Sequence, residues 1–118
     1  MMTDFTRDKP IYSQLVDRIC GDIIKGHLRL GDKLPSVREY AVQSGVNVNT
    51  VQRVYKELEL MQLTETKRGQ GTFITSDEQR LDELRNSMKE QLAESFLASI
   101  ASFGFTKEEM LQLLQQKE

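Results

Sequence analysis

Apolar residues recur every three or four positions near the start of the chain, which is the spacing of an amphipathic helix. Pro10 suits the first turn of such a helix, and Gly26 and Gly31 bracket the loop that must follow it. The pattern therefore predicts a helix that begins at about Pro10 and ends before Gly26. Its apolar stripe consists of Ile11, Leu15, Ile19 and Ile23, flanked by Val16, Cys20 and Ile24.

A shorter second helix is predicted from the residues that mark its two ends. Ser36 followed by Glu39 forms a capping box, in which the serine oxygen accepts a hydrogen bond from the first turn and the glutamate reaches back. Gly45 breaks the helix, so we expect it to cover about residues 36–44. Its packed side should consist of Val37, Tyr40 and Ala41.

A third helix and a hairpin follow. Asn47 can cap the helix, whose apolar residues continue to about Leu60. Beyond it, residues 63–67 and 72–75 alternate apolar and polar positions, which is typical of short strands. The glycine-rich run Arg68-Gly69-Gln70-Gly71 lies between them and predicts a β-hairpin.

The C-terminal part predicts one long and one short helix, separated by Gly104. Ser76 with Gln79 forms a second capping box at the start of the long helix, and Thr106 with Glu109 forms a third at the start of the short helix. The apolar stripe of the long helix consists of Leu81, Leu84, Met88, Leu92, Phe96, Ile100 and Phe103. The short helix carries Met110, Leu111, Leu113 and Leu114.

The order of the first five elements is that of a winged helix-turn-helix: helix, short helix, tight turn, helix and hairpin. We therefore expect a mainly α fold of the α+β winged-helix type, followed by a C-terminal hairpin of two helices. The predicted domains are the winged helix-turn-helix over residues 1–76 and the helical region over residues 77–118.

The third helix has the two faces that a DNA-reading helix needs, since a helix-turn-helix inserts its second helix in the major groove. At about 100° per residue, Val51, Val54, Tyr55 and Leu58 share one side, and Asn49, Gln52, Arg53 and Lys56 share the opposite, acid-free side. Such polar side chains read base edges or bind phosphates. The alternative is that Asn47 and Thr50 only start the helix and that this face is ordinary solvated surface.

The predicted hairpin has a basic tip, where Lys67 and Arg68 stand beside Gly69 and Gly71. A backbone without side chains can approach DNA closely, so the hairpin fits a wing that lies along phosphates or in the minor groove. The glycines also suit the geometry of the turn itself. We expect both roles.

Three motifs at set separations resemble a known family. They are Leu34-Pro35-Ser36-Val37-Arg38-Glu39, Gly45-Val46-Asn47-Val48-Asn49-Thr50-Val51 and Gly69-Gln70-Gly71-Thr72-Phe73. Over residues 10–75 this arrangement resembles the DNA-binding domain of the GntR family of bacterial transcription regulators. The short chain and the pattern Asn-x-Asn-Thr-Val-x-x-x-Tyr resemble its YtrA subfamily, whose C-terminal part is two helices used for dimerisation.

The resemblance implies that Arg38, the start of the third helix and the wing glycines contact DNA, and that the operator is a palindrome. Many family members have Arg where this chain has Val48 and Gln52, so the base-reading set differs here. The alternative for Arg38 is an ion pair with a carboxylate on its own helix. The candidate DNA-binding residues are Arg38, Asn47, Asn49, Thr50, Gln52, Arg53, Lys56, Lys67, Arg68, Gly69 and Gly71.

The charge of the chain agrees with this division of roles. The whole chain has a formal net charge of -2, but residues 1–76 carry 11 basic and 9 acidic side chains (net +2), and residues 77–118 carry 5 and 9 (net -4). A nucleic-acid footprint is a local patch, so the overall acidity does not exclude DNA. The acidic part would stay away from phosphates.

The apolar stripe of the C-terminal helices needs a partner, because the short last helix cannot cover the long one. A second copy of the same hairpin would bury both stripes and place two reading helices in two-fold symmetry. The alternative is a monomer whose long helix folds back on its winged domain. The candidate dimer-interface residues are Leu81, Leu84, Met88, Leu92, Phe96, Ile100, Phe103, Leu111 and Leu114.

Composition excludes several other classes. One cysteine and one histidine leave too few ligands for most metal sites, so we expect neither a metal nor a cofactor. No apolar run approaches the ~20 residues that span a bilayer, and Cys20 has no disulfide partner, so we expect a cytoplasmic protein. A short chain of mostly helical pattern leaves little room for a substrate pocket, so we do not expect an enzyme. Cys20 and His27 have structural roles in this interpretation.

The sequence thus predicts a homodimeric, sequence-specific DNA-binding transcriptional regulator, acting as a repressor at a palindromic operator in double-stranded DNA. No effector domain is evident, although a small-molecule pocket can form between subunits. Two alternatives remain: a winged-helix module for protein-protein contact, and an RNA-binding protein that prefers single strands or A-form helices.

Overall fold

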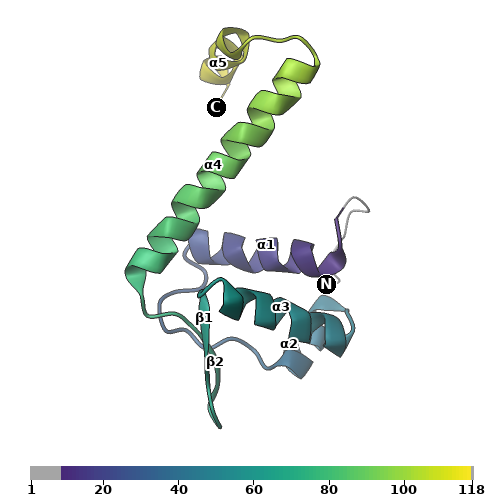
Figure 1. The fold of residues 1–118 in the computed structure, drawn as a ribbon, viewed down its shortest axis with the longest axis vertical. Coiled ribbons are helices and arrows are strands. Elements are labelled where there is room, and N and C mark those ends of the chain that lie inside the picture. The colour runs from purple at the N-terminus through teal and green to yellow at the C-terminus, as the bar shows by residue number, and fades with distance from the viewer. Residues whose placement is uncertain (1–8, 118) are drawn as a thin grey trace. The chain divides into compact units, whose positions relative to one another are not determined.

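The structure is a computed structural model that describes residues 9–117 (Figure 1). It divides into two compact units, Met1–Glu83 and Leu84–Glu118, which we describe separately. Within the described residues the elements follow in the order α1 (Ile11–Ile24), α2 (Val37–Ser44), α3 (Val48–Leu60), β1 (Thr64–Lys67), β2 (Gly71–Ile74), α4 (Glu78–Ser102) and α5 (Lys107–Gln116). The first five elements form the predicted winged helix-turn-helix, and two helices follow it.

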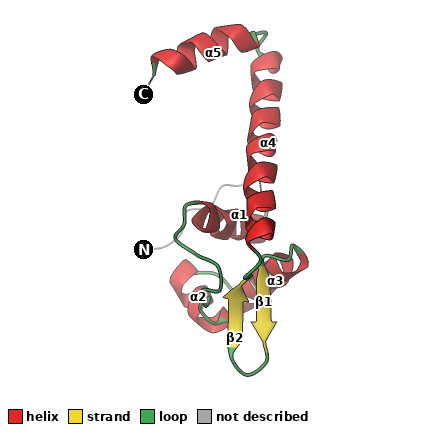
Figure 2. Cartoon of the chain, turned by 90° about the vertical axis from the view of Figure 1, so that its left-hand side faces the viewer, coloured by secondary structure: helices red, strands yellow, loops and turns green. Residues whose placement is uncertain are grey.

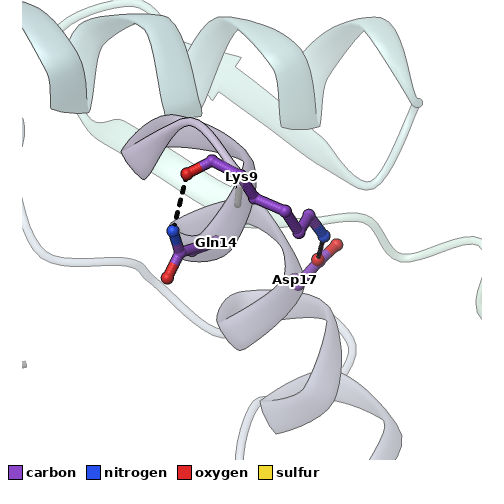
Figure 3. A network of polar contacts seen from close by, with 3 residues as sticks. All are labelled: Lys9, Gln14 and Asp17. Carbon is purple, nitrogen blue, oxygen red and sulfur yellow. Dashed lines mark hydrogen bonds and ion pairs between the residues drawn. The ribbon is translucent and has the colours of Figure 1, made fainter. Parts of the chain in front are cut away.

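Helix α1 begins directly after Pro10, as predicted. Polar contacts surround its first turns: Lys9 forms an ion pair with Asp17, and the Gln14 side-chain amide donates to the Lys9 carbonyl at 2.8 Å (Figure 3). The packed face consists of Leu15, Val16, Ile19, Cys20 and Ile23, all buried.

The turn between α2 and α3 is built from the capping residues that the sequence predicts. Ser36 Oγ accepts from the Glu39 amide at 3.1 Å, and Glu39 Oε1 accepts from the Ser36 amide at 2.9 Å, which completes the capping box. Gly45 ends α2 with a left-handed φ of 70°, a conformation that glycine adopts without a Cβ clash. Asn47 then caps α3 by accepting from the Asn49 amide at 2.7 Å.

The core of the first unit lies where α3 packs on α1, α2 and β1. The side chains of Val51, Val54 and Leu58 are fully buried on one face of α3, as the helical spacing predicts. The prediction for α2 was wrong in part: Ala41 is buried, but Val37 and Tyr40 are only half-buried. Eight residues make about two turns, too few to bury a full stripe.

The β-hairpin is paired with a segment that precedes α2, a pairing that the sequence pattern does not predict. β1 and β2 are antiparallel, with Thr64 opposite Ile74 and Lys67 opposite Gly71. Residues 31–34 lie along the other side of β2: the Leu34 amide donates to the Thr72 carbonyl at 2.9 Å, and the Ile74 amide donates to the Asp32 carbonyl at 2.7 Å. The hairpin is therefore held to the segment that leads into α2 (Figure 2).

The start of α4 corrects a second prediction. Ser76 and Gln79 do not form a capping box. The Asp77 carboxylate accepts from the Gln79 amide at 3.1 Å, and Thr75 Oγ1 accepts from the Asp77 amide at 3.1 Å. Asp is as good an N-cap as Ser, and here it stands one residue nearer the helix, which starts at Glu78.

The second unit contains most of α4, a turn and α5. Gly104, with a φ of 78°, lies in the turn, and the predicted Thr106–Glu109 capping box is present at the start of α5. Helix α5 leads away from the end of α4 instead of lying along it (Figures 1 and 2). Both helices of this unit consequently keep apolar side chains on their surface.

Candidate nucleic-acid interface

The outward face of α3 presents polar side chains to solvent. Asn49, Gln52, Arg53 and Lys56 are all exposed, and no acidic residue interrupts them. The first acid of the helix, Glu57, is half-buried and belongs to its C-terminal half. This face therefore offers amide and cationic donors, the chemistry that reads base edges and neutralises phosphates.

The N-terminus of α3 is held by the residues that also stand in the predicted DNA-binding set. The Asn47 side chain caps the helix, and the Thr50 amide donates to the Asn47 carbonyl at 3.0 Å. Asn47 therefore does start the helix, which is the structural role given above as the alternative to DNA contact. Capping uses only its side-chain oxygen, so the amide donors remain for another partner.

A shallow hollow of about 310 Å³ lies between α3 and the first turn of α1. Asn49, Thr50 and Arg53 line it from α3, and Tyr12 lines it from α1. The Arg53 guanidinium carbon lies 3.6 Å from the centroid of the Tyr12 ring, which is the geometry of a cation–π contact. Tyr12 did not appear among the predicted site residues.

A second hollow, of about 580 Å³, lies between the hairpin and the start of α2. Lys67, Arg68 and Gly71 line it from the hairpin, and Ser36 lines it from the cap of α2. Lys33 also lines it, and it is absent from the predicted site residues because the sequence pattern predicts no element over residues 31–34. Three cations therefore meet at this hollow.

The hairpin tip has the glycine-dependent geometry that the sequence predicts. The Gln70 amide donates to the Lys67 carbonyl at 2.8 Å to close the turn, and Gly69 has a φ of 79°. Gly71 has a φ of 123°, and a Cβ atom there would lie 2.9 Å from Lys33 Cε. Lys67 lies 4.7 Å above the Phe73 ring, so a cation–π contact orients it.

Arg38 lies on the exposed side of α2 and has no ion pair with any carboxylate in residues 9–117. The alternative of an ion pair on its own helix is therefore absent. Arg38, Gln52 and Lys56 are exposed but line neither hollow.

The capping box also sets the charge at the start of α2. Hydrogen bonds from the Ser36 backbone and side chain lower the pKa of the Glu39 carboxyl. Glu39 therefore remains ionised, and it lines the same hollow as Lys33, Lys67 and Arg68.

Cys20 and His27 lie apart from these two hollows. Burial, with a smaller contribution from the Asp17 charge, raises the pKa of the Cys20 thiol to about 11, so the thiol is protonated at neutral pH. His27 is exposed in the loop after α1, with Nδ1 3.5 Å from Asp22 Oδ1. Residues 9–117 contain no cluster of three or more His, Cys, Asp or Glu side chains that could hold a metal ion.

The residues predicted for a dimer interface differ in exposure. Leu84 and Ile100 are buried, and Leu81 and Met88 are half-buried. The others are exposed, namely Leu92 (68%), Phe96 (38%), Phe103 (77%), Leu111 (52%) and Leu114 (52%). Among the described residues, no helix is both long and apolar enough to cross a membrane.

Comparison with known proteins places this arrangement in a family. The sequence profile described as "Bacterial regulatory proteins, gntR family" matches residues 11–74. The HTH-type transcriptional regulator YhcF of Bacillus subtilis is 46% identical over 112 residues, which cover 95% of this chain and 93% of YhcF. The HTH-type transcriptional repressor YtrA of Bacillus subtilis is 36% identical over 97 residues, which cover 77% of this chain and 75% of YtrA.

Solved structures agree with the sequence relatives. A GntR family transcriptional regulator from Listeria monocytogenes superimposes with a TM-score of 0.90 and 39% identity, over 97% of this chain and 100% of that chain. The AraR DNA-binding domain in complex with operator ORX1 superimposes with a TM-score of 0.58 and 25% identity, over 64% of this chain and 95% of that chain. The chain therefore belongs to the GntR family of bacterial regulatory proteins, and within it to the short, YtrA-type DNA-binding transcriptional regulators.

Proposed function

We propose that the chain is a cytoplasmic repressor that binds a palindromic operator in double-stranded DNA as a homodimer. Helix α3 enters the major groove, where Asn49, Thr50 and Gln52 meet base edges and Arg53 and Lys56 meet bases or phosphates. The observation that carries this proposal is the exposed, acid-free outward face of α3 on a helix-turn-helix. The AraR domain of the same fold was solved with its operator, and YtrA is named a repressor.

The wing supplies sequence-independent contacts in this proposal. Lys67 and Arg68 lie along the phosphates, and Gly69 and Gly71 let the backbone come close to the DNA. Lys33 joins them, because it lines the same hollow. Arg38 and Asn47 complete the proposed set on the helix-turn-helix side.

Dimerisation follows from the apolar surface of the second unit. Leu92, Phe96, Phe103, Leu111 and Leu114 are exposed, and water contact with so many large apolar groups is unfavourable. A second copy of the same surface covers them through an isologous interface, and two-fold symmetry matches a palindromic operator.

The test begins with selection of bound sites from random duplex DNA, followed by titration of the best site at fixed salt. Asn49→Ala and Arg53→Ala should each weaken binding by about 10-fold or more. Lys25→Ala is the matched control: Lys25 is an exposed cation at the end of α1 that lines neither hollow of the candidate interface, and its loss should leave affinity within about twofold. RNA duplexes of the same sequence should compete poorly.

Three outcomes would contradict the proposal. Equal affinity of wild type, Asn49→Ala and Arg53→Ala would show that α3 does not read DNA and would favour a protein-interaction module. Better competition by RNA would favour the RNA-binding alternative. A best site without two-fold symmetry would contradict the homodimeric operator complex.

A further inference from the structure

The contact between Tyr12 and Arg53 joins two elements that are 41 positions apart in the sequence. Arg53 belongs to the outward face of α3, and its side chain is exposed. Tyr12 comes from the first turn of α1 and is half-buried. The guanidinium carbon stands 3.6 Å from the ring centroid, close enough for the cation to rest on the ring face.

We propose that Tyr12 is a positioning residue for DNA recognition, which holds the Arg53 guanidinium in the orientation that meets the operator. This inference rests on the proposed function, in which Arg53 contacts DNA. Tyr12 acts through Arg53 and need not touch the DNA itself.

The chemistry of the contact suits positioning. A cation above a ring face is held by the ring quadrupole and uses none of its N–H groups in the process. All five guanidinium donors thus remain for phosphate oxygens or for a guanine edge. A carboxylate partner would instead occupy those donors, and Arg53 has no ion pair within residues 9–117.

The location of the contact between Tyr12 and Arg53 also supports a positioning role. Asn49 and Thr50 line the same hollow as Tyr12 and Arg53, so the held guanidinium lies beside two other members of the proposed reading set. A long, exposed arginine otherwise loses rotamer freedom when it binds. Stacking on Tyr12 in the free protein removes part of that cost before DNA arrives.

The test is a double-mutant cycle on operator affinity, with Tyr12→Leu, Tyr12→Phe, Arg53→Ala and the double variants in the full chain. Tyr12→Leu should weaken binding about fivefold, the typical cost of ordering one long side chain. Tyr12→Phe keeps the ring face and should bind within about twofold of wild type. In the Arg53→Ala background, Tyr12→Leu should have no further effect.

A second measurement uses only the wild-type protein and so does not depend on the folding of any variant. In the NMR spectrum of the wild-type protein, the Arg53 Hδ protons should be shifted upfield by the Tyr12 ring, and they should stay shifted when the operator duplex is added. Thermal unfolding of each variant separates a loss of fold from a loss of affinity, because a purely structural Tyr12 would lower the melting temperature without coupling to Arg53 in binding.

The outcomes distinguish this inference from the proposed function. If wild type binds no duplex, or Arg53→Ala binds as wild type does, the proposed role of Arg53 fails. If Arg53→Ala weakens binding but Tyr12→Leu has the same effect with and without Arg53, the positioning role of Tyr12 is contradicted, and the role of Arg53 in DNA binding stands. Tighter binding by Tyr12→Leu, or Arg53 protons without an upfield shift in the free protein, would also overturn it.

Discussion

At the scale of single residues, Gly71 is the position in the wing where a side chain is least tolerated. Its φ of 123° disfavours any residue with a Cβ atom, and the flexible end of the Lys33 side chain, whose Cε would lie 2.9 Å from that atom, would also have to move. We expect Gly71→Ala to lower the free energy of unfolding by about 1 to 2 kcal/mol, measured by urea denaturation.

Gly21→Ala is the matched control for this substitution. Gly21 lies inside α1, and a Cβ atom there meets nothing within 4 Å. Alanine should therefore raise the free energy of unfolding by about 0.5 to 1 kcal/mol, because it restricts the unfolded chain more than glycine does. Equal effects of the two substitutions would contradict the geometric argument for Gly71.

The buried thiol of Cys20 predicts a dependence of stability on alkaline pH. Its pKa is raised from 9.0 to about 11 in the folded chain, so the unfolded chain loses the proton first as pH rises. The stability that this raised pKa contributes is complete below pH 9 and is lost progressively between about pH 9 and 11. At pH 10 about 1.4 kcal/mol of it has been lost.

The measurement compares urea unfolding of wild type and Cys20→Ala at pH 8 and pH 10. Cys20→Ala should lose less stability over this interval than wild type, whatever constant offset its smaller side chain introduces. Parallel losses in both proteins would mean that the thiol ionises as easily in the folded chain as in the unfolded one.

At the scale of elements, one hydrogen bond holds α3 to the segment before α2. The Tyr55 hydroxyl donates to the Pro35 carbonyl at 2.6 Å, across 20 positions of sequence. Tyr55→Phe leaves that carbonyl without its donor and should lower the free energy of unfolding by about 1 to 2 kcal/mol.

Tyr40→Phe is the control for Tyr55→Phe, because both side chains are half-buried or buried and their ring centroids lie 6.0 Å apart, with the ring planes tilted by 46°. The Tyr40 hydroxyl makes no hydrogen bond within residues 9–117, so its loss should change stability by less than about 0.5 kcal/mol. A larger loss in Tyr40→Phe than in Tyr55→Phe, seen by urea denaturation, would contradict this assignment.

The elements that the sequence predicts well are those with local signals. Ser36 with Glu39, Thr106 with Glu109, and Gly45 lie within a few residues of the helix ends they determine. The predicted N-cap of α4 was wrong by one residue, because Ser76 and Asp77 are adjacent and both can cap a helix.

What the sequence could not predict depends on contacts between distant residues. The pairing of residues 31–34 with β2 joins positions about forty apart, and so short a segment shows no alternating pattern. Tyr12 likewise meets Arg53 only once α1 and α3 have packed. Of the candidate site, the outward face of α3 follows from helical spacing, whereas Lys33 and Tyr12 require the fold.

At the scale of the whole molecule, the exposed apolar residues of the second unit predict the oligomeric state. Phe96→Glu combined with Leu111→Glu should give a monomer by light scattering, because two charges would be buried in the proposed interface. Operator affinity should fall by about 100-fold, since each half-site must then be bound separately.

Val42→Glu is the control for the dimer test. Val42 is 82% exposed on α2, outside the proposed dimer surface, and a charge there should leave the mass of the assembly unchanged. A dimer that survives the double substitution would place the interface elsewhere on the chain.

The pairing of residues 31–34 with β2 holds the hairpin at a fixed position relative to the helix-turn-helix. Because the hairpin is hydrogen-bonded to the segment that leads into α2, it cannot swing independently of the helix-turn-helix. In the proposed complex, the protein then sets the distance between the bases that α3 contacts and the stretch of DNA backbone that the wing contacts. A half-site lengthened by one base pair within that interval must deform the DNA to satisfy both, and its affinity should drop toward that of a wing-deleted protein.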